Sequence, residues 1–311
     1  PCNGTGLSPP TFILTGIPGV PTGSSWPALL LCCLYLLMLL GNCCLLWAIG
    51  TDRGLRTPMH RFLALLALAD LGLSLCTLPT VLAASRSEPP SLRLRSCIAQ
   101  MFFIHSFSAI ESGVLLAMAF DRFVAICHPL HYGSVLTGSL VGRAGGLIVL
   151  RAVSVVLPAA VLVRRMPFCG SHVLSHPFCL HHDMLRLACG DARVSSLYGL
   201  TAVLLTTGLD CLAILLSYVL ILRTILGVVS RQARAKAFST CISHLCAVLI
   251  FYIPLIGLYV THCSGKRLPP LAATLLAHAY LLVPPVLNPL VYSWKTKRIR
   301  RQIRILLCRR G

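Results

Sequence analysis

A few charged side chains at the edge of, or inside, apolar stretches are the residues of this sequence whose chemistry needs explaining. Asp121 and Arg122 stand next to each other where the apolar stretch 97–120 ends. Adjacent opposite charges at the edge of hydrocarbon mark either a membrane boundary or a working site. Carboxyl groups deep inside apolar stretches are functional-site hypotheses by default, and the sequence has three of them: Asp70, Glu111 and Asp210.

The stretches around these residues are long and apolar enough to cross a membrane. Hydrophobic side chains make up 56% of the 311 residues and charged ones 11%, and the mean hydropathy is +0.83, so the chain lacks the polar surface of a soluble globular protein. A helix needs about 20 apolar residues to span hydrocarbon. Seven stretches reach about that length, and their lack of alternation excludes a β-barrel: 26–50, 62–84, 97–120, 145–163, 195–222, 238–262 and 271–292.

The sequence therefore predicts an all-α membrane protein, a bundle of seven transmembrane helices. Basic residues favour the cytoplasmic side. If the segment 1–25 is outside, the outer segments hold nine Lys and Arg residues and the inner ones seventeen. Segment 1–25 and the long loop 164–194 are thus expected outside, and the tail 295–311 inside. With their polar ends included, the helices are expected at about 26–50, 58–84, 95–126, 141–163, 195–226, 234–262 and 271–294.

The formal charge of +19 is ascribed to membrane lipid rather than nucleic acid, because the basic residues are scattered over loops without a basic groove lined by aromatic residues. In the tail, KTKRIRRQIRILLCRR alternates basic residues with Ile and Leu, which predicts a short amphipathic helix on anionic lipid. A merely solvated tail is the alternative. Cys308 in this tail is a palmitoylation candidate or a free thiol. Asn3 begins a glycosylation sequon on the expected outer side.

Sixteen cysteines is a high number for this length. Many lie inside apolar stretches, where a thiol packs as a small apolar side chain. Four lie at the expected outer surface, where an oxidising compartment favours disulfides: Cys97, Cys169, Cys179 and Cys189. Four cysteines allow three pairings, and spacing alone does not choose among them.

Several motifs along the chain resemble those of vertebrate odorant (olfactory) receptors, a branch of the rhodopsin-like G-protein-coupled receptors. KAFSTCISHL is especially specific to that family. The resemblance covers nearly the whole chain and is carried by LGN at 40–42, LRTPMH at 55–60, MAFDRFVAICHPLHY at 118–132, SY at 217–218, KAFSTCISHL at 236–245 and PPVLNPLVYSWKTKRIR at 284–300. FILTGIPG at 12–19, FFIHSFSAIES at 102–112 and FYIPLIGLYVTH at 251–262 are similar to the class I, fish-like branch.

The resemblance implies a rhodopsin-type bundle that is not an enzyme and requires no cofactor. It implies that a small odorant binds near the outer end and that a stimulatory G protein, of the Golf or Gs type, is activated inside to raise cAMP. It also implies location in the plasma membrane, in olfactory cilia. Two disulfides follow by analogy, Cys97 with Cys179 and Cys169 with Cys189.

The family pattern places the odorant pocket between the third, fifth and sixth helices, beneath the long outer loop. His105 lies eight residues inward of Cys97, which is about 12 Å along a helix at 1.5 Å per residue; a packing histidine is the alternative. His181 and His182, just after Cys179, are expected to form a lid. Imidazole suits copper and zinc, yet no closed ligand set is evident. The expected pocket wall is Ile104, Ser108, Val203, Tyr252, Ile256 and Tyr259, with Cys263 at its outer edge.

Two hypotheses, a conformational switch and an ion site, concern the charged residues. Asp121 can hold Arg122 in a resting state and release it when neighbouring helices move; a simple anchor, with Arg122 snorkelling to lipid phosphate, is the alternative. Pro289 after Asn288 makes a hinge or a tolerated kink, and Tyr292 could then swing toward Arg122. Lys236, in the KAFSTC motif, is assigned to the G-protein side.

Asp70 and Glu111 are expected to meet near Asn288, where they could share a sodium ion or a proton, since oxygen ligands suit a hard cation. A protonated carboxyl group bonded to serines is the alternative, and helix packing is the first interpretation of Asp210.

One departure from the family pattern bears on the ligand. Class I receptors for carboxylic acids carry an Arg after the His at the outer end of helix six, whereas this sequence has His262 and Cys263. A thiol cannot grip a carboxylate bidentately, so a neutral or weakly polar odorant is expected, unless Lys266 or Arg267 substitutes. The alternatives are a receptor for a non-odorant metabolite such as a short-chain carboxylate, and a small-solute transporter. Inverted repeats typical of transporters and the enzyme motifs HExxH and GxSxG are not found.

Overall fold

Long helices form where the apolar stretches lie, because a chain in lipid must satisfy its backbone polar groups internally. The computed structural model describes residues 11–19, 25–84, 90–169, 172–263 and 269–308. Its fifth long helix has three parts: α7 (Arg193–Val203), the π-helical segment η3 (Leu204–Gly208) and α8 (Leu209–Gly227). The others are α1 (Ser25–Thr51), α2 (Pro58–Ala84), α3 (Leu94–Cys127), α5 (Gly138–Arg164), α9 (Arg231–Cys263) and α10 (Pro270–Lys295).

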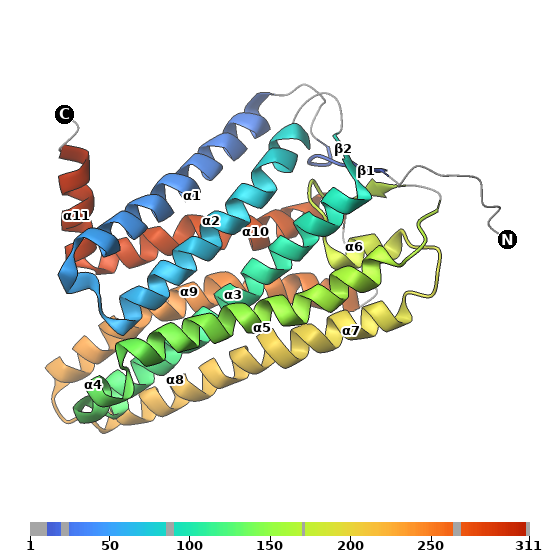
Figure 1. The fold of residues 1–311 in the computed structure, drawn as a ribbon. Coiled ribbons are helices and arrows are strands. Elements are labelled where there is room, and N and C mark those ends of the chain that lie inside the picture. Colours follow the sequence, from blue (N-terminus) through green and yellow to red (C-terminus); the bar gives the residue numbers. More distant parts are fainter. Residues whose placement is uncertain (1–10, 20–24, 85–89, 170–171, 264–268, 309–311) are drawn as a thin grey trace.

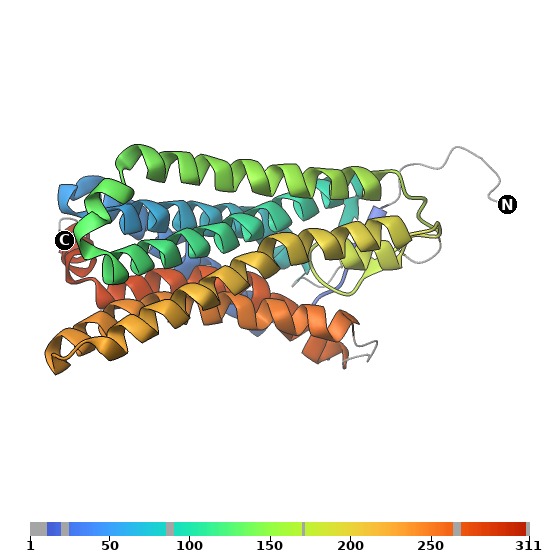
Figure 2. The ribbon, with the colours of Figure 1, turned by 90° about the horizontal axis from the view of Figure 1, so that it is seen from below.

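The long helices run side by side as one bundle with two distinct ends (Figures 1 and 2). The strands and α6 (His181–Arg186) lie at one end, here called the lid end; α4 (Tyr132–Val135) and α11 (Lys297–Cys308) lie at the other, the α11 end. Within the described residues, six of the long helices are long and apolar enough to cross a membrane, and α3, with 34 residues, is the seventh. The chain is an all-α membrane protein, and the ends of its long helices lie within three residues of those expected.

The outer faces of the bundle are apolar. Leu29, Leu147 and Leu212 are each more than 60% exposed, which suits contact with lipid tails. The interior is formed around α3, which packs against α2, α5, α8 and α9. Its buried face carries polar residues as well as apolar ones, including Glu111 and Asp121. Among the described residues, α3 therefore carries more of the buried polar groups than any other helix.

A small three-stranded sheet at the lid end was not expected from the sequence. β1 (Thr11–Leu14) lies between β2 (Ser91–Arg93), with which it pairs antiparallel, and β3 (Val173–Leu174), with which it pairs parallel. Phe12 and Leu14 alternate inward and are fully buried in the cluster that contains the Cys97–Cys179 disulfide. The sheet fixes the segment before α1 onto the long loop 164–194.

Two disulfides fasten this loop. Cys97 at the start of α3 bonds to Cys179, and Cys169 bonds to Cys189. These are the two pairings that the family resemblance implied. Asn3, the glycosylation candidate, and the loop residues Lys266 and Arg267 lie outside the described residues.

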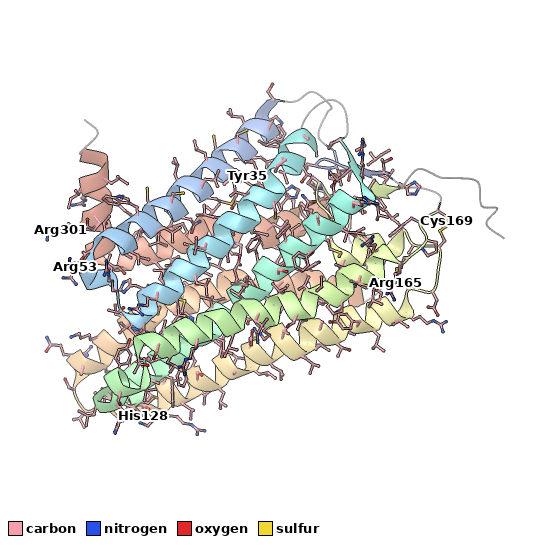
Figure 3. The ribbon with its side chains drawn as sticks, viewed as in Figure 1. Tyr35, Arg53, His128, Arg165, Cys169 and Arg301 are labelled. Carbon is pink, nitrogen blue, oxygen red and sulfur yellow. A yellow bond between two sulfur atoms is a disulfide. The ribbon has the colours of Figure 1, made fainter. Side chains whose placement is uncertain are left out.

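α11 docks on the turn between α1 and α2 at the other end. Ile299 is fully buried there, and Arg298 donates a hydrogen bond to the Gly54 carbonyl over 3.1 Å. The N–H of Gly54 in turn donates to the carboxylate of Asp52, the N-cap of this turn, at 2.8 Å, and that hydrogen bond lowers the pKa of Asp52. In Figure 3, Arg53 and Arg301 both lie at this end. The helix thus has one apolar side against the bundle and a basic outer side.

Candidate functional site

A cavity of about 270 Å³ lies inside the bundle at the lid end. Its floor and sides come from α3, α5, the α7–η3 segment, α9 and α10, and α6 covers it together with Leu180. Apolar side chains make up most of its wall, including Met101, Val155 and Leu255. Among the described residues that line it, none is Asp, Glu, Lys or Arg. A mostly apolar hollow with a few polar groups is the usual form of a small-molecule site.

Several polar groups of the cavity are already hydrogen-bonded within the protein. Tyr280 on α10 donates a hydrogen bond to the Ser108 hydroxyl over 2.7 Å. The backbone N–H of His181 donates to Nε2 of His105 over 3.3 Å, so the His105 proton belongs on Nδ1. The ring of His181 in turn lies 3.2 Å from the Ser195 hydroxyl. A ligand with an oxygen or hydroxyl group can exchange partners with these groups without leaving a charge unpaired.

Six of the pocket residues expected from the sequence line this cavity, and three do not. Ile104 is fully buried in the bundle core but is not among the residues that line the cavity. Ile256 is 51% exposed on the outer face of α9, because it stands about 100° around the helix from Leu255. Tyr252 lies one turn below the cavity. The residues that line it are His105, Ser108, His181, His182, Val203 and Tyr259. The side chain of Cys263 is outside the described part of the chain.

The lid is held by the Cys97–Cys179 disulfide and by Gln100. The Gln100 amide oxygen accepts a hydrogen bond from the Cys179 N–H at 2.9 Å, and its amide nitrogen donates to Thr80 at 2.8 Å. α2, α3 and the loop are therefore joined directly above the cavity. Nearby, burial lowers the pKa of His176, whose ring stacks on Phe178.

A partly buried ion pair lies below the cavity and was not foreseen. Arg151 on α5 binds the Asp210 carboxylate on α8 with two hydrogen bonds, of 2.8 and 2.6 Å. Ser112 on α3 donates to the same carboxylate at 2.8 Å and lies 3.0 Å from the hydroxyl of Tyr252 on α9. The network joins four helices, and Tyr252 also reaches the carbonyl of Thr207, a residue that lines the cavity.

The sequence did contain a signal for this pair. Arg151 is the one Lys or Arg residue inside the seven apolar stretches, and Asp210 is an acid inside another of them. Because ionised groups in a membrane interior pair with one another, these two were each other's natural partners. The interpretation of Asp210 as a helix-packing residue missed this specific contact.

Asp70, Glu111 and Asn288 do come together on α2, α3 and α10. The Asn288 amide donates to the Asp70 carboxyl at 3.1 Å, and Glu111 is hydrogen-bonded to the same carboxyl group. All three are buried. Within the described residues, Oε1 of Glu111 has no hydrogen-bond partner. Several oxygen atoms converge here, one of them unpaired, so the residues fit a hard cation such as sodium or a shared proton.

The break at Pro289 is compensated by α1. Proline lacks the N–H that would bond to the carbonyl four residues earlier, that of Pro285. The side chain of Asn42, from the LGN motif, donates to that carbonyl at 2.9 Å. The kink in α10 is therefore satisfied by a neighbouring helix and leaves no free carbonyl at Pro285.

At the α11 end, Asp121 and Arg122 form an ion pair. Asp121 also accepts a hydrogen bond from the Tyr132 hydroxyl at 2.8 Å, and burial, reinforced by this carboxylate, raises the pKa of Tyr132. The Arg122 side chain is only 14% exposed, so it does not extend to the surface as a snorkelling anchor would. The geometry agrees with a locally held arginine.

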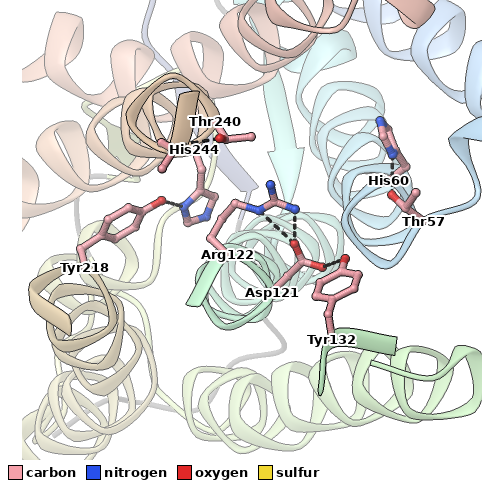
Figure 4. A network of polar contacts seen from close by, with 9 residues as sticks. Thr57, His60, Asp121, Arg122, Tyr132, Tyr218, Thr240 and His244 are labelled. Carbon is pink, nitrogen blue, oxygen red and sulfur yellow. Dashed lines mark hydrogen bonds and ion pairs between the residues drawn. The ribbon is translucent and has the colours of Figure 1, made fainter. Parts of the chain in front are cut away.

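Groups from two other helices surround this pair. Figure 4 shows the Arg122 guanidinium between Asp121 and the ring of His244. His244 on α9 is 2.6 Å from the Tyr218 hydroxyl on α8 and 3.0 Å from the Leu115 carbonyl on α3, which ties α9 to both helices. The hydroxyl of Tyr292 is buried without a hydrogen-bond partner in the described structure. Lys236 is exposed on the first turns of α9.

These features define a seven-helix membrane receptor, with a small-molecule cavity at one end and a locked ion pair at the other. Comparison with known proteins gives the family. A family model described as olfactory receptor matches residues 31–310. The chain is 51% identical over 298 residues to the Homo sapiens protein named olfactory receptor 51G2, covering 96% of this chain and 95% of that one. It is 52% identical to olfactory receptor 51L1 of the same species, covering 94% and 92%.

The chain belongs to the olfactory receptor family of G-protein-coupled receptors. It is accordingly not an enzyme, and its family implies odorant and G-protein partners. Family membership also decides between the receptor and the transporter interpretations in favour of the receptor.

Proposed function

We propose that this receptor binds a neutral or weakly polar odorant in the cavity beneath α6 and activates a stimulatory G protein at the α11 end, raising cAMP. The observation that carries this is the cavity itself, with a hydroxyl pair and a neutral imidazole as its polar groups. The described lining residues include no Lys or Arg that could bind a carboxylate. A short-chain carboxylate would be buried there without a cation, at a cost of several kcal/mol.

The orientation follows from chemistry at the two ends. Both disulfides lie at the lid end, which suits an oxidising outer surface. The α11 end carries the basic helix, which suits the anionic inner leaflet. An odorant then enters from outside and the G protein binds inside, at the plasma membrane of olfactory cilia.

For activation, the proposal is that the odorant favours a bundle arrangement in which the α11 end opens. In this arrangement Arg122 separates from Asp121. The Tyr292 hydroxyl, which has no hydrogen-bond partner in the described structure, gains one. The Asp70–Glu111–Asn288 site holds a sodium ion or a proton in the resting state and loosens as α10 moves about Pro289.

The test is a cAMP screen of volatile alcohols, esters, ketones and acids in cells that express the receptor, followed by variants. With the agonist found, Tyr280→Phe and His105→Ala should raise its EC50 at least 10-fold, since each removes one polar group of the cavity. Ile256→Ala is the matched control, because Ile256 lies nearby on α9 but faces outward. Equal responses from all three variants at equal surface expression would refute this ligand site.

A further inference from the structure

Two histidines and an aspartate gather beside the cavity, on the lid. Nε2 of His182 lies 3.3 Å from one oxygen of Asp183, and Nε2 of His176 lies 3.5 Å from the other. The three groups can each offer one ligand atom, and these atoms all lie within 4.8 Å of one another. His182 lines the cavity, but none of the three belongs to the hydrogen-bonded pairs of the pocket or to the switch described above.

The two nitrogen–oxygen contacts are longer than those of tight ion pairs and leave room for an ion. Charge-assisted N–H···O hydrogen bonds are usually about 2.7–2.9 Å long, shorter than either distance here. In a tetrahedral zinc site the ligands lie about 2.0–2.1 Å from the ion, which places neighbouring ligand atoms about 3.3 Å apart. The separations of 3.3 and 3.5 Å are close to this value, although each runs to a different oxygen of Asp183, and one ligand atom from each of the three residues lies within 4.8 Å of the others.

The ligand set is held by fixed elements. His182 and Asp183 lie in the first turn of α6, and His176 follows β3 two residues after Leu174. Cys179, between them in sequence, is fastened to α3 by its disulfide. His176 and Asp183 are 4% exposed, whereas the His182 side chain is 28% exposed. An ion can therefore reach the site past His182, and the other two ligands are pre-oriented.

We propose that His176, His182 and Asp183 bind a divalent transition-metal ion of the zinc type, with one position left open to water. Two imidazoles and one carboxylate are a donor set for zinc, whereas calcium and magnesium take more oxygen ligands. The sequence had suggested a metal at His181 and His182. The geometry replaces His181, whose ring is engaged with Ser195, by His176.

A bound ion would clamp α6 to the segment after β3. His182 also lines the cavity, so the clamp would fix one wall of the lid over the pocket. The proposed metal site lies on the lid and does not depend on which odorant the cavity binds.

The test is Zn²⁺ binding to the purified full-length receptor in lipid nanodiscs, measured by competition with a chromophoric chelator. Wild type should bind one Zn²⁺ ion. The variants Asp183→Asn, His176→Gln and His182→Gln should each lower the Zn²⁺ affinity at least 10-fold, because even the loss of a group that only orients a ligand lowers metal affinity 10- to 100-fold. His131→Gln, an exposed histidine at the α11 end, is the control and should bind as wild type does.

A second measurement guards against adventitious binding by free cysteines or misfolding of variants. Co²⁺ added to wild type should give the visible absorption of a tetrahedral nitrogen and oxygen site, without the near-ultraviolet bands of thiolate ligands. Thiolate bands, or equal Zn²⁺ affinity in wild type and the three variants, would overturn the proposal. So would the absence of Zn²⁺ binding by wild type.

Discussion

Removal of the Asp210 carboxylate should destabilise the receptor strongly, because it strands a cation inside the bundle. In Asp210→Ala, Arg151 loses both of its hydrogen bonds to the carboxylate and Ser112 loses a third. Removing one partner of a buried pair costs about 3–5 kcal/mol. The lower end applies, since the Arg151 side chain is 34% exposed. At roughly 2 °C per kcal/mol for a chain of this size, the variant should denature about 6 °C below wild type.

The assay is thermal denaturation of the purified receptor in detergent, followed with a dye that reacts with cysteines such as Cys241 as they become exposed. Arg151→Met combined with Asp210→Ala removes both charges and should recover at least half of the loss. Asp191→Asn is the matched control, because Asp191 and its partner Arg193 are exposed and such pairs contribute about 0–1 kcal/mol. A single variant that melts within 1 °C of wild type, or a double variant no more stable than the single, would refute the reasoning.

Four further predictions concern the switch, the disulfides and the ligand. Arg122→Ala should abolish agonist-stimulated cAMP at normal surface expression; an unchanged response would reject its role. Tyr132→Phe removes a hydrogen bond to Asp121, worth about 1.5–3 kcal/mol, and should raise basal cAMP about 10-fold, whereas unchanged basal cAMP would show that this bond does not hold the resting state. Loop-closure entropy gives about 4.5 kcal/mol for the Cys97–Cys179 disulfide and about 3.3 kcal/mol for Cys169–Cys189, so Cys97→Ser should lower surface expression more than Cys169→Ser; the reverse order would contradict this ranking. Cys263→Arg should shift the response toward carboxylic acids, and a wild type that already prefers acids and is unaffected by the substitution would show the neutral pocket to be wrong.

The helices were predictable because length and apolarity alone decide where a chain crosses a membrane. α2 begins and ends at the expected residues, Pro58 and Ala84. The small sheet was not predictable, since β1, β2 and β3 are two to four residues long and pair across large sequence separations. Such short strands carry too little pattern to be recognised before their partners are known.

Within the site, residues that a motif fixes lie at the cavity as expected, whereas residues whose position depends on the rotation of a helix do not. His105 and His181 were placed by the family pattern, and they meet at the cavity. Ile256 was assigned to the pocket by its position along α9, but a turn of about 100° directs it outward. The Arg151–Asp210 contact depends in the same way on how α5 and α8 face each other, which the sequence of either helix alone does not specify.

The most direct test of the central claim, that the odorant occupies the cavity beneath α6, is to fill that cavity from Gly199. A Cβ atom at Gly199 would meet the His181 ring at 2.7 Å, so Gly199→Leu must push into the lid and the space below it. Gly146→Leu is its control, since nothing lies within 4 Å of a Cβ atom there. With surface expression matched, the agonist's EC50 in the cAMP assay should rise at least 10-fold for Gly199→Leu and stay unchanged for Gly146→Leu. A Gly199→Leu receptor with the wild-type EC50 would contradict the account.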